Sequence, residues 1–231
     1  MKQIYPDLWI TEPEHALPEL PDLMMCAYLL VRPTGNVLFC RSEHDADHRR
    51  IRELGGITHQ YLTHWHEAAP GLARIKDMFG SKLVCHRLAE EIVGKFAAVD
   101  VAFDTRHVHL GDIEVIPTPG HTPGSTCFRY RSSHGQTYLF AGDTLFPSRG
   151  RWEAVVFEDG SASDLKQSLA LLRGVDADVV LCGVAVADVP FRAMSRAEWH
   201  AALEQAARSL PEDATERGPA ASGRNPRPRA G

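Results

Sequence analysis

The sequence lacks a long apolar run, an excess of positive charge and any segment that resembles a secretory signal. None of its apolar segments approaches the length of a membrane span, and residues 1–10 do not contain the apolar stretch of a signal peptide. The formal net charge is −5, so there is no overall basic field that would attract nucleic acid or an anionic membrane. We therefore expect a cytoplasmic protein that has neither nucleic acid nor a membrane as its partner. No oligomeric state is predicted.

The sequence also lacks paired cysteines. Its five cysteines are scattered and never form a C-x-x-C pair, which argues against a disulfide framework or a thiolate zinc site. We expect them to be reduced and mostly buried, as small hydrophobic residues of a cytoplasmic protein. They are Cys26, Cys40, Cys85, Cys127 and Cys182.

Short apolar runs alternate with helical patterns along most of the chain, which favours a layered α/β architecture in a single domain over residues 1–210. The helix that starts near residue 163 is expected to be capped by Ser163. After Leu210 the composition turns to Pro, Gly and charged residues, so residues 211–231 are predicted to be a disordered tail. Strands are expected at 27–32, 36–40, 59–63, 82–85, 107–110, 113–117, 125–131, 137–141 and 178–182, and helices at 44–54, 70–78, 88–96, 163–172 and 196–209.

Metal-capable side chains follow three of the predicted strands. His64 and His66 stand two residues apart in T-H-W-H (63–66), His121 lies in P-T-P-G-H-T-P-G-S (117–125), and Asp143 lies in F-A-G-D-T-L-F (140–146). Side chains placed directly after strands can gather at one edge of a sheet. These residues are therefore predicted to form one metal site.

Two donor sets can be drawn from these residues. His64, His66 and His121 with a water form a tetrahedral set that suits zinc and leaves an open position, with Asp143 as a fourth ligand or as the group that orients the water. His64, His121 and Asp143 form instead the two-histidine, one-carboxylate set of non-heme iron oxygenases. The sequence predicts one zinc ion and leaves iron, or no metal, as alternatives.

These motifs resemble those of the metallo-β-lactamase superfamily, especially its glyoxalase II-like and persulfide dioxygenase-like branch. The resemblance rests on T-H-W-H (63–66), T-P-G-H-T-P-G-S (118–125) and A-G-D-T-L-F (141–146), with G-R at 150–151 and S-L-A-L-L at 168–172, and it covers roughly residues 1–210. It implies a four-layer αββα sandwich with a metal site at one edge, and a small-molecule substrate.

The departures from the family pattern concern a second metal. Family members commonly read H-x-H-x-D-H, and the Asp and His of that motif bind a second ion, whereas this chain has Ala68 and Ala69. A further family histidine aligns with Val184. The resemblance therefore implies that the second site is lost. The family aspartate at position 68 also positions the attacking water, so the usual general base is missing as well.

The resulting hypothesis is a mononuclear metal-dependent hydrolase of a small ester, thioester or lactone-like substrate. Asp143 would be the catalytic residue, and Arg149 and Arg151 would contact the substrate. Glu67 is a possible substitute base, although a residue beside His66 is expected to face solvent. Two alternatives remain: a catalytically inactive binding or regulatory protein on the same scaffold, and a mononuclear iron dioxygenase that acts on a sulfur substrate.

Overall fold

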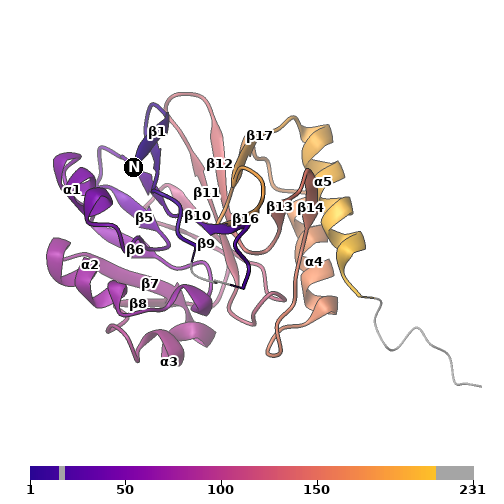
Figure 1. Cartoon of the computed structure of the whole chain (residues 1–231), viewed down its shortest axis with the longest axis horizontal. Helices are drawn as coiled ribbons and strands as arrows, with labels where there is room; N and C mark the ends of the chain where they lie inside the picture. Colours follow the sequence, from indigo (N-terminus) through magenta and orange to yellow (C-terminus); the bar gives the residue numbers. More distant parts are fainter. Residues whose placement is uncertain (16–18, 212–231) are drawn as a thin grey trace, which may run out of the picture.

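The chain folds into four layers, in which two β-sheets lie face to face and helices cover their outer sides (Figure 1). This computed structural model describes residues 1–15 and 19–211, so the tail predicted at 211–231 lies, apart from Pro211, outside the described residues. Within the described ranges, no helix has the length and the apolar character needed to cross a membrane.

Two large sheets and one small sheet make up the strand layers. The first has the order β1-β2-β4-β5-β6-β7-β8, the second β17-β15-β12-β11-β10-β9, and the small one β14-β13-β16-β3. The strands are β1 (Lys2–Tyr5), β2 (Leu8–Ile10), β3 (Leu23–Met25), β4 (Tyr28–Leu30), β5 (Val37–Phe39), β6 (His59–Tyr61), β7 (Lys82–His86), β8 (Val101–Phe103), β9 (His107–His109), β10 (Ile113–Pro117), β11 (Thr126–Arg131), β12 (Thr137–Gly142), β13 (Phe146–Ser148), β14 (Arg151–Glu153), β15 (Val179–Cys182), β16 (Val184–Val186) and β17 (Phe191–Ala193).

The packing of the two large sheets explains why the sequences of their central strands are continuous apolar runs. Successive side chains of a strand point to opposite faces. In β4, Tyr28 and Leu30 belong to the core between the sheets, whereas Leu29 belongs to the cluster beneath the helices. Across the inner core, the rings of Phe39 from β5 and Phe140 from β12 stack with their centroids 3.7 Å apart. Because both faces of these strands are covered, most of their side chains are apolar on both faces.

Helices cover both outer faces, which confirms the predicted αββα sandwich. Helices α1 (Asp45–Glu53), α2 (Gly71–Phe79) and α3 (Glu90–Val93) pack on the first sheet, and α4 (Ala162–Leu172) and α5 (Arg196–Ser209) pack on the second (Figure 1). All five cysteines are buried and free, as expected from their spacing.

The predicted elements are present, with two corrections. The helix expected at 88–96 is a 3₁₀ turn (Arg87–Ala89) followed by the short α3, which ends at Val93, before Gly94, a residue of low helix propensity. Helix α4 is capped by Ser161 rather than Ser163, because Ser161 has an extended backbone and its hydroxyl accepts a hydrogen bond from the Asp164 amide at 3.1 Å. The strands not foreseen in the sequence are three or four residues long.

The two large sheets approach each other closely at the edge where β6, β10 and β12 end. Strands β10 and β12 are both antiparallel to β11, so they run in the same direction and end on the same side. There the Thr126 amide donates a hydrogen bond to the Thr63 carbonyl at 2.8 Å. Gly142, with a φ of +53°, lies so near that a Cβ would be 2.2 Å from Thr63 Oγ1. Only glycine fits this contact without displacing Thr63.

We expect Gly142→Ala to destabilise the fold more than Gly80→Ala. Both glycines have positive φ, but a Cβ at Gly80 meets nothing within 4 Å. In Gly80→Ala the free energy of unfolding should fall only by the cost of a left-handed backbone, about 1–2 kcal/mol. In Gly142→Ala it should fall by roughly 1–3 kcal/mol more, because of overpacking. Urea unfolding in the presence of a chelator measures both, and equal losses would show that the contact with Thr63 is not tight.

Candidate metal centre

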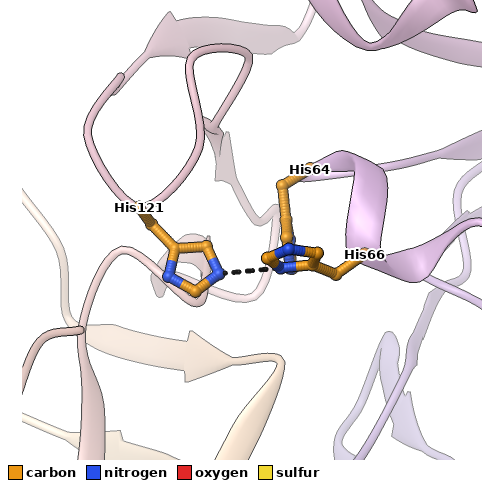
Figure 2. A group of neighbouring side chains, drawn as sticks. All are labelled: His64, His66 and His121. Carbon is orange, nitrogen blue, oxygen red and sulfur yellow. Dashed lines mark hydrogen bonds between the residues drawn. The ribbon is translucent and has the colours of Figure 1, made fainter. Parts of the chain in front are cut away.

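Three histidine side chains converge at this edge of the sandwich (Figure 2). His64 and His66 flank Trp65, where the chain leaves β6 and enters a 3₁₀ turn (Trp65–Glu67). His121 comes from the loop that follows β10. In Figure 2 its ring points toward the two rings on the other segment, as the sequence predicted.

The spacing of the histidine nitrogens fits a tetrahedral cation. One ligand nitrogen from each of His64, His66 and His121 lies within 4.8 Å of the other two, and His66 Nδ1 lies 3.3 Å from His121 Nε2. Zinc binds imidazole nitrogens at about 2.0–2.1 Å in a tetrahedral arrangement, which places two such nitrogens about 3.4 Å apart. The closest pair is therefore already at the separation that a shared zinc ion requires.

The tautomer of His64 follows from a chain of hydrogen bonds behind it. The hydroxyl of Thr63 donates its hydrogen to Glu67 Oε1 at 2.5 Å, so the same oxygen is left to accept from His64 Nδ1 at 3.0 Å. With Glu67 ionised, this chain places the hydrogen on Nδ1, and Nε2 carries a lone pair. That Nε2 is buried and has no hydrogen-bond partner within the described residues.

The backbone fixes His121 in the same way. Its Nδ1 donates to the carbonyl oxygen of Val155 at 2.9 Å, which leaves the lone pair of Nε2 pointing toward His66. A histidine that ligates a metal commonly donates its second nitrogen to a carbonyl or a polar side chain, since this fixes both tautomer and ring orientation. His64 and His121 both have this arrangement.

Burial keeps the three imidazoles neutral. Burial, followed by the neighbouring His121 and His66, holds the pKa of His64 well below its ordinary value. Burial and then His121 lower the pKa of His66 to about 4. The pKa of His121 is also lowered by burial, against the effect of its bond to Val155. Neutral imidazole is the form that binds a metal, so the site does not need to lose protons from its histidines at neutral pH.

Asp143 faces the same point from the end of β12. Its Oδ2 lies 3.5 Å from His64 Nε2 and 3.9 Å from His121 Nε2. Its Oδ1 is a buried atom without a hydrogen-bond partner in the described part of the chain, and burial raises the pKa of the carboxyl to about 7. Unpartnered buried polar atoms are rare in folded proteins. The unpartnered His64 Nε2 and the facing carboxylate fit a cation, and the residues present can hold one.

The second donor group is missing from the structure as it is from the sequence. Among residues 1–15 and 19–211, one group of three or more potential ligands meets at a point, the three histidines. Ala68 packs against the apolar cluster that contains Leu62 and Leu72, and Val184 contributes an isopropyl group. The positions where family members bind a second ion offer no ligand atom here.

Glu67 does not face solvent, contrary to the prediction. The 3₁₀ turn directs it back beneath β6, where its Oε2 accepts a hydrogen bond from the Thr63 amide at 2.8 Å, and only 3 % of the residue is exposed. Burial raises the pKa of this carboxyl to about 8. The only signal in the sequence was the spacing of four residues between Thr63 and Glu67, which places them on one side of a helical turn.

A cavity of about 320 Å³ opens beside the histidines. Arg41 lines it and was not foreseen as a site residue. Arg149 and Arg151, predicted to bind substrate, lie on the β13–β14 hairpin, and Arg149 pairs with Asp22 at 3.0 Å. Neither belongs to the described residues that line the cavity, and a contact with substrate stays a prediction. The lining residues are Leu23, Met25, Cys40, Arg41, His64, His66, Glu67, Asp143, Phe157, Gly183 and Val184.

The comparison with known families agrees with this geometry. Residues 24–184 match the family model of the metallo-beta-lactamase superfamily. The chain belongs to the metallo-β-lactamase superfamily. This confirms the predicted family, and the fold of this superfamily is that of metal-dependent hydrolases.

Solved structures show the same fold. A metallo-beta-lactamase from Pontibacter korlensis has a TM-score of 0.64 at 18% identity, covering 88% of this chain and 97% of the other. A motif mutant of a metallo-beta-lactamase from Cronobacter sakazakii has a TM-score of 0.60 at 22% identity, covering 79% of each chain. ETHE1 from Myxococcus xanthus has a TM-score of 0.59 at 21% identity, covering 87% of this chain and 92% of the other.

We expect Thr63→Val to weaken metal binding at the three histidines without removing a ligand. The substitution deletes the hydroxyl that joins Glu67 to His64 Nδ1, so the His64 ring loses its orientation. Loss of such a supporting hydrogen bond typically lowers metal affinity about 10–100-fold. Competition with a chromophoric chelator measures the affinity. Thr118→Val is the matched control, because this buried hydroxyl contacts Thr144 and Cys127 but not the histidines. An unchanged affinity in Thr63→Val would contradict the role of the hydrogen-bond chain.

Proposed function

We propose that this protein is a mononuclear zinc-dependent hydrolase of a small ester, thioester or lactone-like substrate. One observation carries the proposal: two histidines have tautomers fixed by hydrogen bonds behind them, and their lone pairs point to the place that the third histidine also faces. The absence of ligand atoms at Ala68, Ala69 and Val184 supports one ion rather than two.

The participation of His66 favours zinc over iron. A two-histidine, one-carboxylate iron site would use His64, His121 and Asp143 and leave His66 outside. Instead, His66 Nδ1 lies 3.3 Å from His121 Nε2, whereas Asp143 Oδ2 lies 3.9 Å from the same nitrogen. A zinc ion held by three imidazoles would supply a Lewis acid and a bound water with a pKa near 7.

The residues of the chain would orient the reactants and move the proton. Asp143 Oδ2 faces the histidines, so it is placed to accept a proton from the water that attacks the substrate carbonyl and to return it to the departing oxygen or sulfur. Ala68 cannot do this, although family members have an aspartate there. Glu67 is occupied by its bonds to Thr63, so it acts by holding His64 rather than as the base.

We expect the purified protein to contain about one equivalent of zinc and to hydrolyse simple esters, thioesters or lactones. His121→Ala should lose both the metal and the activity. Asp143→Asn should keep the zinc and lower kcat about 10²–10⁴-fold, the usual contribution of a general base. His107→Ala, at a histidine on β9 outside the site, is the control and should change neither.

Metal analysis by mass spectrometry and assays with chromogenic substrates separate the alternatives. A folded protein that binds no zinc and hydrolyses none of these substrates would contradict the proposal and favour an inactive binding protein. Bound iron together with oxygen uptake on thiol or persulfide substrates would favour a dioxygenase.

A further inference from the structure

The cavity beside the histidines has an apolar wall built by the small sheet. Strands β3 and β16 are antiparallel, with Met25 opposite Val184 and Leu23 opposite Val186. Side chains two residues apart on a strand share a face, so the three residues Leu23, Met25 and Val184 line one side of the cavity together. This wall adjoins the histidines on the side of Asp143 and Gly183.

The wall includes the position where the sequence departs from the family pattern. Val184 stands where family members have a metal-binding histidine, and it is only 8 % exposed. Gly183 leaves this side of the cavity open, because a Cβ there would lie 2.6 Å from Asp143 Oδ1. Cys40 also lines the cavity, and burial raises the pKa of its thiol, so this surface is uncharged as well. Val184 and Gly183 therefore leave room for an apolar group on this side of the cavity.

The one permanently charged cation among the described residues that line the cavity is not free to bind an anion. Arg41 Nη1 lies 2.6 Å from Glu43 Oε1 and 3.4 Å from Glu14 Oε2. Its Nε donates to the carbonyl oxygen of Glu67 at 3.1 Å. Because two carboxylates already neutralise this guanidinium, a substrate group that carries a carboxylate or a phosphate would find no unpaired positive side chain at the wall.

We propose that the Leu23–Met25–Val184 wall is a binding subsite for the uncharged aliphatic acyl chain of the substrate. The inference deepens the proposed function and rests on it for the identity of the bound group. The acyl part is assigned to this wall because Val184 is buried, whereas Phe157, the other large apolar residue that lines the cavity, is 49 % exposed. A cavity of about 320 Å³ is at the small end of ligand sites, so the chain is short.

Binding to the chelator-treated protein tests the subsite without any turnover. The probes are unbranched amides from acetamide to hexanamide, and succinamate, in which a carboxylate replaces the alkyl end. Ligand-observed NMR titrations should show that affinity rises roughly fourfold per methylene, the factor that corresponds to about 0.8 kcal/mol, until the cavity is full. Succinamate should bind more weakly than butanamide. Affinity that does not depend on chain length, or equal binding of succinamate, would overturn the proposal.

Near-isosteric variants locate the binding surface. Val184→Thr keeps the branched shape but adds a hydroxyl, and it should weaken pentanamide binding about fivefold while leaving acetamide binding unchanged. Met25→Gln should act in the same direction. Val108→Thr is the matched control, because Val108 is a β9 residue that is 60 % exposed and does not line the cavity, and it should bind like the parent protein. Unchanged pentanamide binding in both cavity variants would place the chain elsewhere and refute the subsite.

The two proposals can fail separately. Chain-length-dependent amide binding in a protein that hydrolyses nothing would retain the apolar subsite and refute the hydrolase. Ester hydrolysis without any dependence of KM on acyl length would retain the hydrolase and refute the subsite. Zinc content should be the same in Val184→Thr and the parent protein, since Val184 offers no ligand atom.

Discussion

The close contact of the two large sheets at Thr63 is the constraint on which the site depends. The carbonyl oxygen of Thr63 accepts a hydrogen bond from Thr126 of the second sheet, and its side chain lies against Gly142, where no larger residue fits. This contact brings the end of β6 next to the end of β12, so that His64 and Asp143 face each other. The hydroxyl of the same threonine also fixes the tautomer of His64. Thr63 thus takes part both in the packing of the two sheets and in the orientation of the His64 ring.

Burial gives the candidate metal centre its electrostatic character. It lowers the pKa values of the histidines and raises those of Glu67 and Asp143, so every one of these groups is shifted toward its neutral form. A site of this kind holds lone pairs in a region poor in water, where a cation interacts strongly with them. Val184, together with Leu23 and Met25, leaves one side of the cavity apolar. Val184 thus lines the cavity and offers no ligand atom for a metal.

Much of the fold could be predicted from the sequence because its signals are local. The helix at residues 196–209 and the hairpin of β4 and β5 follow from apolar periodicity and turn residues, and both are present. The cap of α4 was misplaced by two residues, since Ser161 and Ser163 are equally able to cap and only the backbone conformation at Ser161 distinguishes them. The short strands of the small sheet have too few residues for a periodic pattern, and the pairing of β16 with β13 and β3 joins segments far apart in the chain.

The sequence by itself determined which ligand types are available: three histidines and an aspartate placed after strands, and no donor at residues 68, 69 and 184. Only the tertiary structure decided how they are used. The pairing of Arg41 with Glu14, the hydrogen bond from Arg41 to the Glu67 carbonyl oxygen and the apolar wall at Val184 all arise from contacts between segments distant in the chain. Hydrogen bonding, burial and charge pairing depend on distances of a few ångströms in space, and these distances exist only once the two sheets have packed together.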